Sequence, residues 1–338
     1  MNPNWRSFLE SAEGLFDGES AELLNFGDAA GELQAASRQT VVVPLTHLGL
    51  IEAVGEDAKP FLHGQLTSDI NHLAPGQWQH SGWCSAKGRM QASFVAWRDG
   101  DAYRLLISAD LQEAIQKRLQ MFVLRAKVRV ASLSDAVLLL GVSGPQAAEA
   151  LGDAALPCPE APGGVAAADG VTVLRLEAER YVVALPESAM AGLWQKLTVK
   201  ARPAGLPAWR WLDVRNAFPL VTLATREEFV PQMADFEKIG GVSFHKGCYP
   251  GQEVVARTQY LGKVKRHLFR IAADTVFAAG DELHSPDNPD QACGKVMTAA
   301  PSPAGGWEGL AVIQSNFAAS ARLGSREGAS VRALAVNP

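Results

Sequence analysis

The chain has 338 residues, of which 47% are hydrophobic and 20% charged, a composition typical of folded globular proteins and sufficient for two or three domains. Its formal net charge of −5 argues against broad nucleic-acid binding, which depends on neutralising phosphates with Lys and Arg. The four cysteines are scattered without a CxxC pair, which excludes a disulfide framework and the usual zinc patterns.

The start of the chain carries no signal for export or membrane insertion. Residues 1–6 lack a cationic segment followed by an apolar run, and no apolar stretch in the chain reaches 18 residues. We therefore expect a cytoplasmic protein with no membrane partner. We also expect a monomer without a tightly bound metal.

Residues 1–38 are polar, acidic and rich in alanine, and we expect them to be a lead-in, with regular structure beginning at Thr40. β-branched residues over 40–44 and an apolar run over 48–54 predict two strands. Asp57 then precedes a helix-like segment and is a candidate N-cap.

A β-meander followed by a helix is predicted next. Asp-Gly supplies the positive φ that a hairpin turn needs, and apolar residues then recur at near-helical spacing. The predicted order is a strand ending at Cys84, a turn at 85–88, a strand at 91–97, a turn at 98–101, a strand at 103–107, a helix at 111–122 and a strand from Val128. Strands that are covered by a helix indicate an α+β unit.

A second unit that mixes strands and helices follows, and then a segment punctuated by Gly and Pro that predicts a small all-β module. A stretch rich in Ala, Gly, Pro and Asp predicts a mobile loop inside the second unit. The predicted elements are strands at 137–142, 171–176 and 181–185, helices at 146–151 and 189–197, the loop at 152–170 and a strand at 264–271.

The most informative segment is HKGCYPGQE at residues 245–253. Pro250 and Gly251 fit the second and third positions of a type II turn, and Gln252 opens a predicted helix with an acid in its first turn. Cys248 would lie on a loop beside cationic side chains, a setting that lowers a cysteine pKa from about 8.5 to about 3.5–7.5. The alternative is a structural turn whose cysteine is a buried filler.

The KGCYPGQE sequence at 246–253 resembles the signature of the YgfZ family of folate-binding proteins, relatives of the aminomethyltransferase T-protein of the glycine cleavage system. Three further segments resemble parts of the family and occur in the right order. They are HGQLTSD at 63–69, CSAKGRM at 84–90, and FVPQM at 229–233 followed by GGVSF at 240–244. The likeness runs from about residue 40 to the end of the chain.

This resemblance implies an α+β fold class, with two α+β sandwich units and a small C-terminal β-barrel in a T-protein-like three-domain ring that admits a folate. The implied layout is a polar lead-in at 1–38, a first folate-binding-type domain at 39–132 completed by 205–262, a second α+β domain at 133–204 and the β-barrel module at 263–338.

The resemblance also implies a function. The chain would be a folate-binding accessory factor in the assembly or repair of iron–sulfur proteins, including enzymes that modify tRNA. Its cofactor would be tetrahydrofolate or a derivative, and its partners would be iron–sulfur proteins or their assembly factors. Cys248 would be the functional thiol, with Lys246 tuning it.

The same resemblance, together with the chemistry of the side chains, indicates a set of candidate folate-binding residues. A pterin ring stacks well on an aromatic face, and Trp209 resembles a tryptophan that the family uses near its folate. Lys87 and Arg89 flank a hairpin turn and could hold the carboxylates of the folate tail, or could simply be solvated. Asp69 could contact a ligand or cap backbone amides. The candidates are Trp209, Asp69, Lys87, Arg89, Tyr249, Gln252, Glu253 and Arg257.

A cationic run lies close to Cys248 in the sequence. It could attract an acidic ligand and lower the thiol pKa, or it could be a solvated edge strand. Its members are Arg257, Lys263, Lys265, Arg266, His267 and Arg270.

The chain departs from the relatives at four positions. T-proteins carry an Asp-Asp pair in the strand after the first hairpin turn, whereas Gln91 and Ala92 here cannot act as a general base, which argues against aminomethyl transfer. Relatives commonly place a glutamate where Arg215 stands, and a guanidinium has no acceptor for a pterin. Leu48 replaces a tryptophan that some relatives carry.

Two rival functions follow from the same residues. One is a folate-dependent, aminomethyltransferase-like one-carbon transferase. The other is a cysteine-nucleophile hydrolase, for which His245 or His267 would have to orient on the thiol.

Overall fold

The structure is a computed structural model that describes residues 2–18, 22–262 and 264–336. Lys263 of the cationic run, together with residues 1 and 19–21 of the predicted lead-in, lies outside the described residues. The chain divides into unit 1, made of Met1–Ala58, Leu73–Trp78 and Ala96–Trp209, and unit 2, made of Lys59–His72, Gln79–Val95 and Arg210–Pro338. The four-part layout implied by the resemblance stays a prediction.

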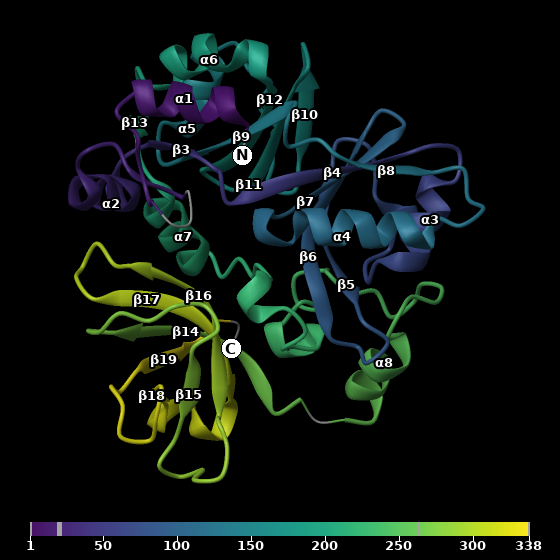
Figure 1. Ribbon diagram of the computed structural model, residues 1–338, viewed down its shortest axis with the longest axis vertical. Coiled ribbons are helices and arrows are strands. Elements are labelled where there is room, and N and C mark those ends of the chain that lie inside the picture. The colour runs from purple at the N-terminus through teal and green to yellow at the C-terminus, as the bar shows by residue number, and fades with distance from the viewer. Residues whose placement is uncertain (1, 19–21, 263, 337–338) are drawn as a thin grey trace. The chain divides into compact units, whose positions relative to one another are not determined.

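Helices alternate with strands along the chain (Figure 1). The helices are α1 (Pro3–Ser11), α2 (Ala29–Arg38), α3 (Ala58–Gln65), α4 (Ala109–Phe122), α5 (Ala147–Asp153), α6 (Met190–Leu197), α7 (Leu206–Arg215) and α8 (Gln252–Tyr260). Among the described residues, no helix combines the length and the apolar character needed to cross a membrane.

A six-stranded sheet forms the core of unit 1. Its order is β10 (Val165–Ala168), β11 (Val171–Glu177), β12 (Arg180–Pro186), β9 (Val137–Ser143), β3 (Val41–Pro44) and β13 (Arg202–Pro203). The strands pair antiparallel, except that β13 runs parallel to β3. β9 is buried over nearly its whole length, which explains its continuous apolar sequence.

The predicted meander is confirmed as a five-stranded sheet. Its order is β5 (Trp78–Cys84), β6 (Met90–Asp99), β7 (Ala102–Ser108), β4 (Leu48–Val54) and β8 (Arg129–Ser132). Gly88 and Gly100 hold positive φ values of 70° and 60° in the two turns, as the turn sequences require. α4 packs on β4, β7 and β8, as its apolar spacing predicts.

The segment before Thr40 is folded, so the prediction that regular structure begins at Thr40 is wrong. α1 buries Trp5 and Leu9, and the Trp5 ring lies edge-on to Trp194 of α6 with 6.5 Å between ring centroids. Strands β1 (Leu15–Phe16) and β2 (Leu23–Asn25) lie between α1 and α2 in the chain and pair with each other. The sequence did not predict this, because the few apolar residues before Thr40 are spaced among acidic ones without a clear helical or strand period. Some of them are nevertheless buried in the core.

A second correction concerns the predicted loop at 152–170. Its residues Val165–Ala168 form β10, which pairs with β11 at the edge of the sheet. The small side chains of this edge strand are half-buried or exposed, so they leave no apolar pattern in the sequence.

The C-terminal module is a curled antiparallel sheet of unit 2. Its order is β18 (Arg322–Leu323), β15 (Glu282–His284), β16 (Gly294–Pro301), β17 (Trp307–Gln314), β14 (Arg266–Ala273) and β19 (Arg332–Ala335). Its core includes Ile271, Leu283 and Val296, each 0% exposed. The edge strands β18 and β19 follow one another in the chain, and Arg322 of β18 forms an isolated bridge with Ser330, which precedes β19. The all-β prediction is confirmed as a half-barrel.

The buried lead-in makes a testable prediction. Replacing Trp5, which is 3% exposed, with Ala should lower the free energy of unfolding by about 3–5 kcal/mol, because a large buried ring leaves a cavity. Leu15→Ala, at a side chain that is 53% exposed in the same segment, is the control and should change stability little. Urea unfolding measures both, and equal effects would contradict a packed lead-in.

Candidate functional site

The cysteine loop is fixed by a turn of the predicted type. The Gln252 N–H donates to the Tyr249 carbonyl at 3.2 Å, and Gly251 has φ 79° and ψ 2°, the values of the third position of a type II turn. A Cβ on Gly251 would lie 2.3 Å from the Ser85 carbonyl oxygen, so only glycine fits there. The turn leads directly into α8.

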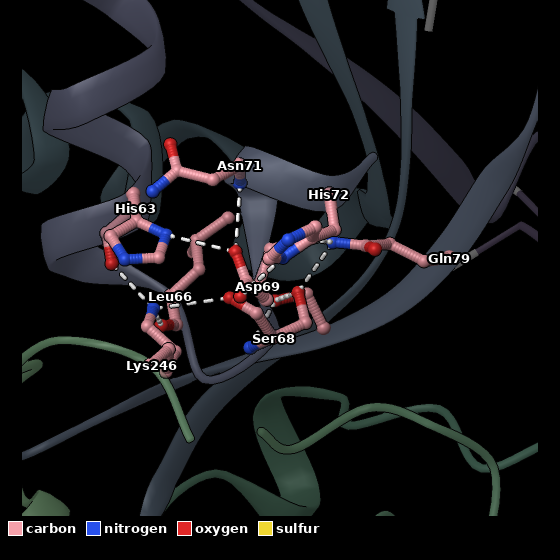
Figure 2. Close-up of polar contacts among 9 residues, drawn as sticks. His63, Leu66, Ser68, Asp69, Asn71, His72, Gln79 and Lys246 are labelled. Atoms are coloured by element: carbon pink, nitrogen blue, oxygen red, sulfur yellow. Dashed lines mark hydrogen bonds and ion pairs between the residues drawn. The ribbon is translucent and has the colours of Figure 1, made fainter. Parts of the chain in front are cut away.

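Lys246 anchors the loop to the end of α3 (Figure 2). Its Nζ donates to the backbone carbonyls of His63 and Leu66, and to that of Ser68 at 3.1 Å. The last carbonyls of a helix have no partner within the helix, and a cation there also interacts favourably with the helix dipole. The ammonium therefore satisfies the end of α3 while holding the loop in place.

The ring of Tyr249 lies beside the same ammonium. Lys246 Nζ is 5.1 Å from the centroid of the Tyr249 ring, and Tyr249 is 6% exposed. Burial lowers the pKa of Lys246 to about 8, and the Asp69 carboxylate opposes that shift. Because this value is above neutrality, the ammonium is the main form at pH 7.

Asp69 organises the polar groups on the other side of Lys246. Its carboxylate accepts from the Asn71 N–H at 2.9 Å and from His72 Nδ1 at 2.8 Å, and lies 3.3 Å from His63 Nδ1. The capping role that the sequence allows is therefore present. Burial raises the pKa of Asp69, but the bonds from His72 and Asn71 outweigh it and hold that pKa below its ordinary value.

Cys248 is exposed, so it is not a buried filler. Its neighbour Lys246 is half-buried and Tyr249 is buried, so the thiol stands on a loop that is anchored on both sides. Cys84 differs, because it is buried and burial raises its pKa to about 12. Cys158 is a second exposed thiol, in unit 1.

The hairpin turn that carries Lys87 and Arg89 packs on the start of α8. A Cβ on Gly88 would lie 2.9 Å from the Val254 Cβ, which shows how closely the two segments meet. Lys87 and Arg89 are exposed, and Arg89 donates to the backbone carbonyl of Glu228 at 2.5 Å.

α8 carries the other predicted residues of this surface. Arg257 is exposed one turn beyond Val254, on the side of α8 that meets the hairpin turn. Glu253 is exposed as well, whereas Gln252 is half-buried. The structure therefore brings the predicted cations Lys87, Arg89 and Arg257 to the region around α8.

Trp209 occupies a different environment from the one the resemblance implies. It belongs to unit 1 and is 1% exposed. The Arg180 guanidinium lies 4.2 Å from the centroid of its ring, and a Cβ on Gly141 would lie 2.3 Å from the ring. The indole therefore packs against Arg180 and Gly141, and its role in folate binding stays a prediction.

The residues that depart from the T-protein pattern are buried or contact other side chains of the protein. Gln91 is 2% exposed and accepts from Arg226 at 3.4 Å, while Ala92 is 0% exposed. Arg215 is half exposed and lies 3.8 Å from Glu308.

Side chains of the cationic run bind to several different neighbouring groups. Arg266 donates to the Ala292 carbonyl and Arg270 to the carbonyls of Val214 and Arg215. His267 Nδ1 lies 2.9 Å from the buried carboxylate of Asp235. Three of the six side chains of the run therefore serve the packing of unit 2. Within residues 2–18, 22–262 and 264–336, no cluster of three or more His, Cys, Asp or Glu side chains is placed to hold a metal ion.

Comparisons with known proteins agree with the sequence signature. A family model described as the GCVT N-terminal domain matches residues 20–237. The tRNA-modifying protein YgfZ of Photorhabdus laumondii subsp. laumondii is 32% identical over 256 residues, which cover 74% of this chain and 77% of that protein. The protein of the same name from Escherichia coli K12 is 32% identical over 246 residues, 72% and 75% of the two chains.

The chain belongs to the YgfZ family. The crystal structure of the glycine cleavage system aminomethyltransferase T from Bartonella henselae matches all of this YgfZ-family chain and 97% of its own, with a TM-score of 0.78 and 18% identity. At that identity the match shows the fold alone. The predicted relation to the T-protein fold is therefore confirmed.

One residue beside the YgfZ-family loop was missed by the sequence analysis. His63 lies in the HGQLTSD segment, and a Cβ on Gly247 would lie 3.6 Å from His63 Nε2. Burial, followed by the charge of Lys246, lowers the pKa of His63. The available signal was a histidine within a segment already assigned to the family, but its nearness to Gly247 depends on a contact between segments that are distant in the sequence.

The Lys246 anchor predicts a change in stability. Lys246→Met should lower the free energy of unfolding by about 1–3 kcal/mol, because three half-buried carbonyls lose their donor. Lys87→Met, at an exposed lysine of the same unit, is the control and should have little effect. Chemical denaturation measures both variants.

The pH dependence of this effect has a defined sign. The folded-state pKa of Lys246, about 8, lies below its ordinary value of 10.5, so the unfolded state binds more protons between these values. Wild type should therefore gain stability as the pH rises from 8 to 10.5, and Lys246→Met should lack that gain. Parallel pH curves would contradict the buried ammonium.

Proposed function

We propose that this YgfZ-family protein is an accessory factor that supports iron–sulfur proteins, including enzymes that modify tRNA, and that it acts through the Cys248 thiol. The observation that carries this proposal is the exposed thiol on a loop anchored by Lys246 and Tyr249. The similar proteins from Photorhabdus laumondii and Escherichia coli are named tRNA-modifying proteins, which supports the proposed class of client.

A single thiol supports a transient role. A protein-bound iron–sulfur cluster normally takes four cysteine ligands, and the other three cysteines include the buried Cys84 and Cys293. The thiol would therefore act on a client protein or on a small molecule and would not hold a resident cluster.

The transferase alternative lacks support from the residues of this chain. The strand position at which T-proteins carry two aspartates holds buried Gln91 and Ala92, neither of which can accept a proton as a carboxylate does. The hydrolase alternative requires His245 or His267 to orient on the thiol, and among the described residues neither histidine forms a hydrogen bond with Cys248.

The role of Cys248 is tested in cells that lack their own YgfZ-family protein. Cys248→Ala should fail to restore the activity of an iron–sulfur enzyme that modifies tRNA, measured as the fraction of modified nucleoside. Cys158→Ala is the matched control, because it removes the other exposed thiol, and it should restore activity fully. Full activity with Cys248→Ala would overturn the proposal.

A folate is proposed as the ligand. The residues of this chain suit its glutamate tail better than its pterin ring. The buried Trp209 ring and the Arg215 guanidinium do not provide a stacking face or an acceptor for a pterin. The exposed cations Lys87 and Arg257, on adjoining segments, suit the carboxylates of the glutamate tail. We therefore propose that the tail supplies much of the binding.

Calorimetric titration tests this mode of binding. Tetrahydrofolate with a triglutamate tail should bind more tightly than the monoglutamate, and added salt should weaken the difference. Lys87→Ala with Arg257→Ala should lower the triglutamate affinity by about tenfold, the effect of losing roughly 1.4 kcal/mol of binding. Lys117→Ala, at an exposed lysine of unit 1, is the control. Equal affinities would contradict the tail mode, and no heat with either ligand would remove folate from the account.

A further inference from the structure

His63 lies between a carboxylate and the cysteine loop. Its side chain is 17% exposed, and its Nδ1 lies 3.3 Å from Asp69 Oδ1. Its other ring nitrogen, Nε2, lies on the side of Gly247, where a Cβ on that glycine would be 3.6 Å away. Gly247 is the residue before Cys248, so one edge of the imidazole borders the backbone that carries the thiol.

The charges around His63 determine its protonation state. The groups that act on it are Lys246, Asp69, His72 and Lys59. Burial has the largest effect and lowers its pKa, and the Lys246 charge lowers it further, while Asp69 opposes the shift. Because the ordinary value is 6.5, His63 is mainly neutral at pH 7.

The position of Asp69 also selects the tautomer of the neutral ring. The Asp69 carboxylate lies 3.3 Å from Nδ1 and electrostatically favours a ring proton on that nitrogen, although the two atoms do not form a hydrogen bond. The lone pair is then on Nε2, on the side of the cysteine loop. A neutral imidazole with its acceptor nitrogen beside a cysteine loop has the arrangement of a base in thiol chemistry.

We propose that His63, oriented by Asp69, is the proton acceptor for the Cys248 thiol. The inference rests on the proposed role of Cys248 and adds a residue to it. Lys246 cannot take this part, because its ammonium donates to carbonyl oxygens and has no lone pair. Asp69 is a positioning residue that acts through the histidine.

The glycine at 247 leaves room for this proton transfer. Gly247 is bonded directly to Cys248 and has no side chain, so residue 247 leaves the Nε2 edge of the ring uncovered. A methyl group at residue 247 would contact this edge at 3.6 Å. Gly247 has no positive φ, so alanine is compatible with its backbone.

The step can be followed with iodoacetamide. The thiol proton passes to His63 Nε2, the sulfur forms a bond to the methylene carbon, and iodide leaves with the electron pair of the carbon–iodine bond. The imidazolium then returns its proton to solvent. A general base of this kind contributes only when it is deprotonated, so its titration appears in the rate.

The test measures the alkylation rate of Cys248 against pH in the full chain carrying Cys158→Ser, which removes the other exposed thiol. The profile should contain a lower step, below pH 6.5, that comes from His63. His63→Asn should remove the lower step and slow alkylation at pH 7 by about tenfold or more, within the range of general-base effects.

Two further variants separate this role from a structural one. Gly247→Ala should remove the lower step although His63 remains, because the methyl group covers Nε2. His72→Asn should keep it, since His72 also binds Asp69 but is 85% exposed. A lower step that persists in both His63→Asn and Gly247→Ala would overturn the inference. If the step is lost as expected while Cys248→Ala is fully active in cells, the proposed function fails and the inference stands.

Discussion

The candidate site depends on one interaction, the ammonium of Lys246 held by the backbone carbonyls of His63, Leu66 and Ser68. These carbonyls belong to the end of α3 and the residues just after it, where the helix has no internal donors left. The same cation lies beside the Tyr249 ring. One side chain thus completes a helix end and fixes the loop that carries Cys248.

The cysteine loop has residues that are held in place on both sides of an exposed thiol. Lys246 and Tyr249 are held in unit 2, and Gly251 fits a close backbone approach that no other residue allows, which sets the direction of α8. Cys248 lies between these fixed points and is exposed. A thiol presented in this way suits an encounter with another molecule, as the proposed accessory function requires. The neighbouring pair His63 and Asp69 adds a base at the same place.

The sequence predicts those features whose cause is local. The Pro-Gly turn, the Asp-Gly hairpin and the apolar helix of the meander depend on residues that are neighbours in the chain, and all appear as expected. The role of Lys246 could not be read in this way, because its acceptors lie 178 to 183 residues upstream. The packing of Trp209 on Gly141 is equally hidden, because a tryptophan on a ligand and one packed on a glycine look alike in a sequence.

The most direct test of this account is hydrogen–deuterium exchange of the backbone amides over residues 244–252, compared between wild type and Lys246→Met. If the ammonium fixes the loop, exchange in the variant should become faster over these residues and over the end of α3, with the half-barrel unchanged. Equal protection of the loop in the two proteins would contradict the central claim that Lys246 holds Cys248 in its exposed position.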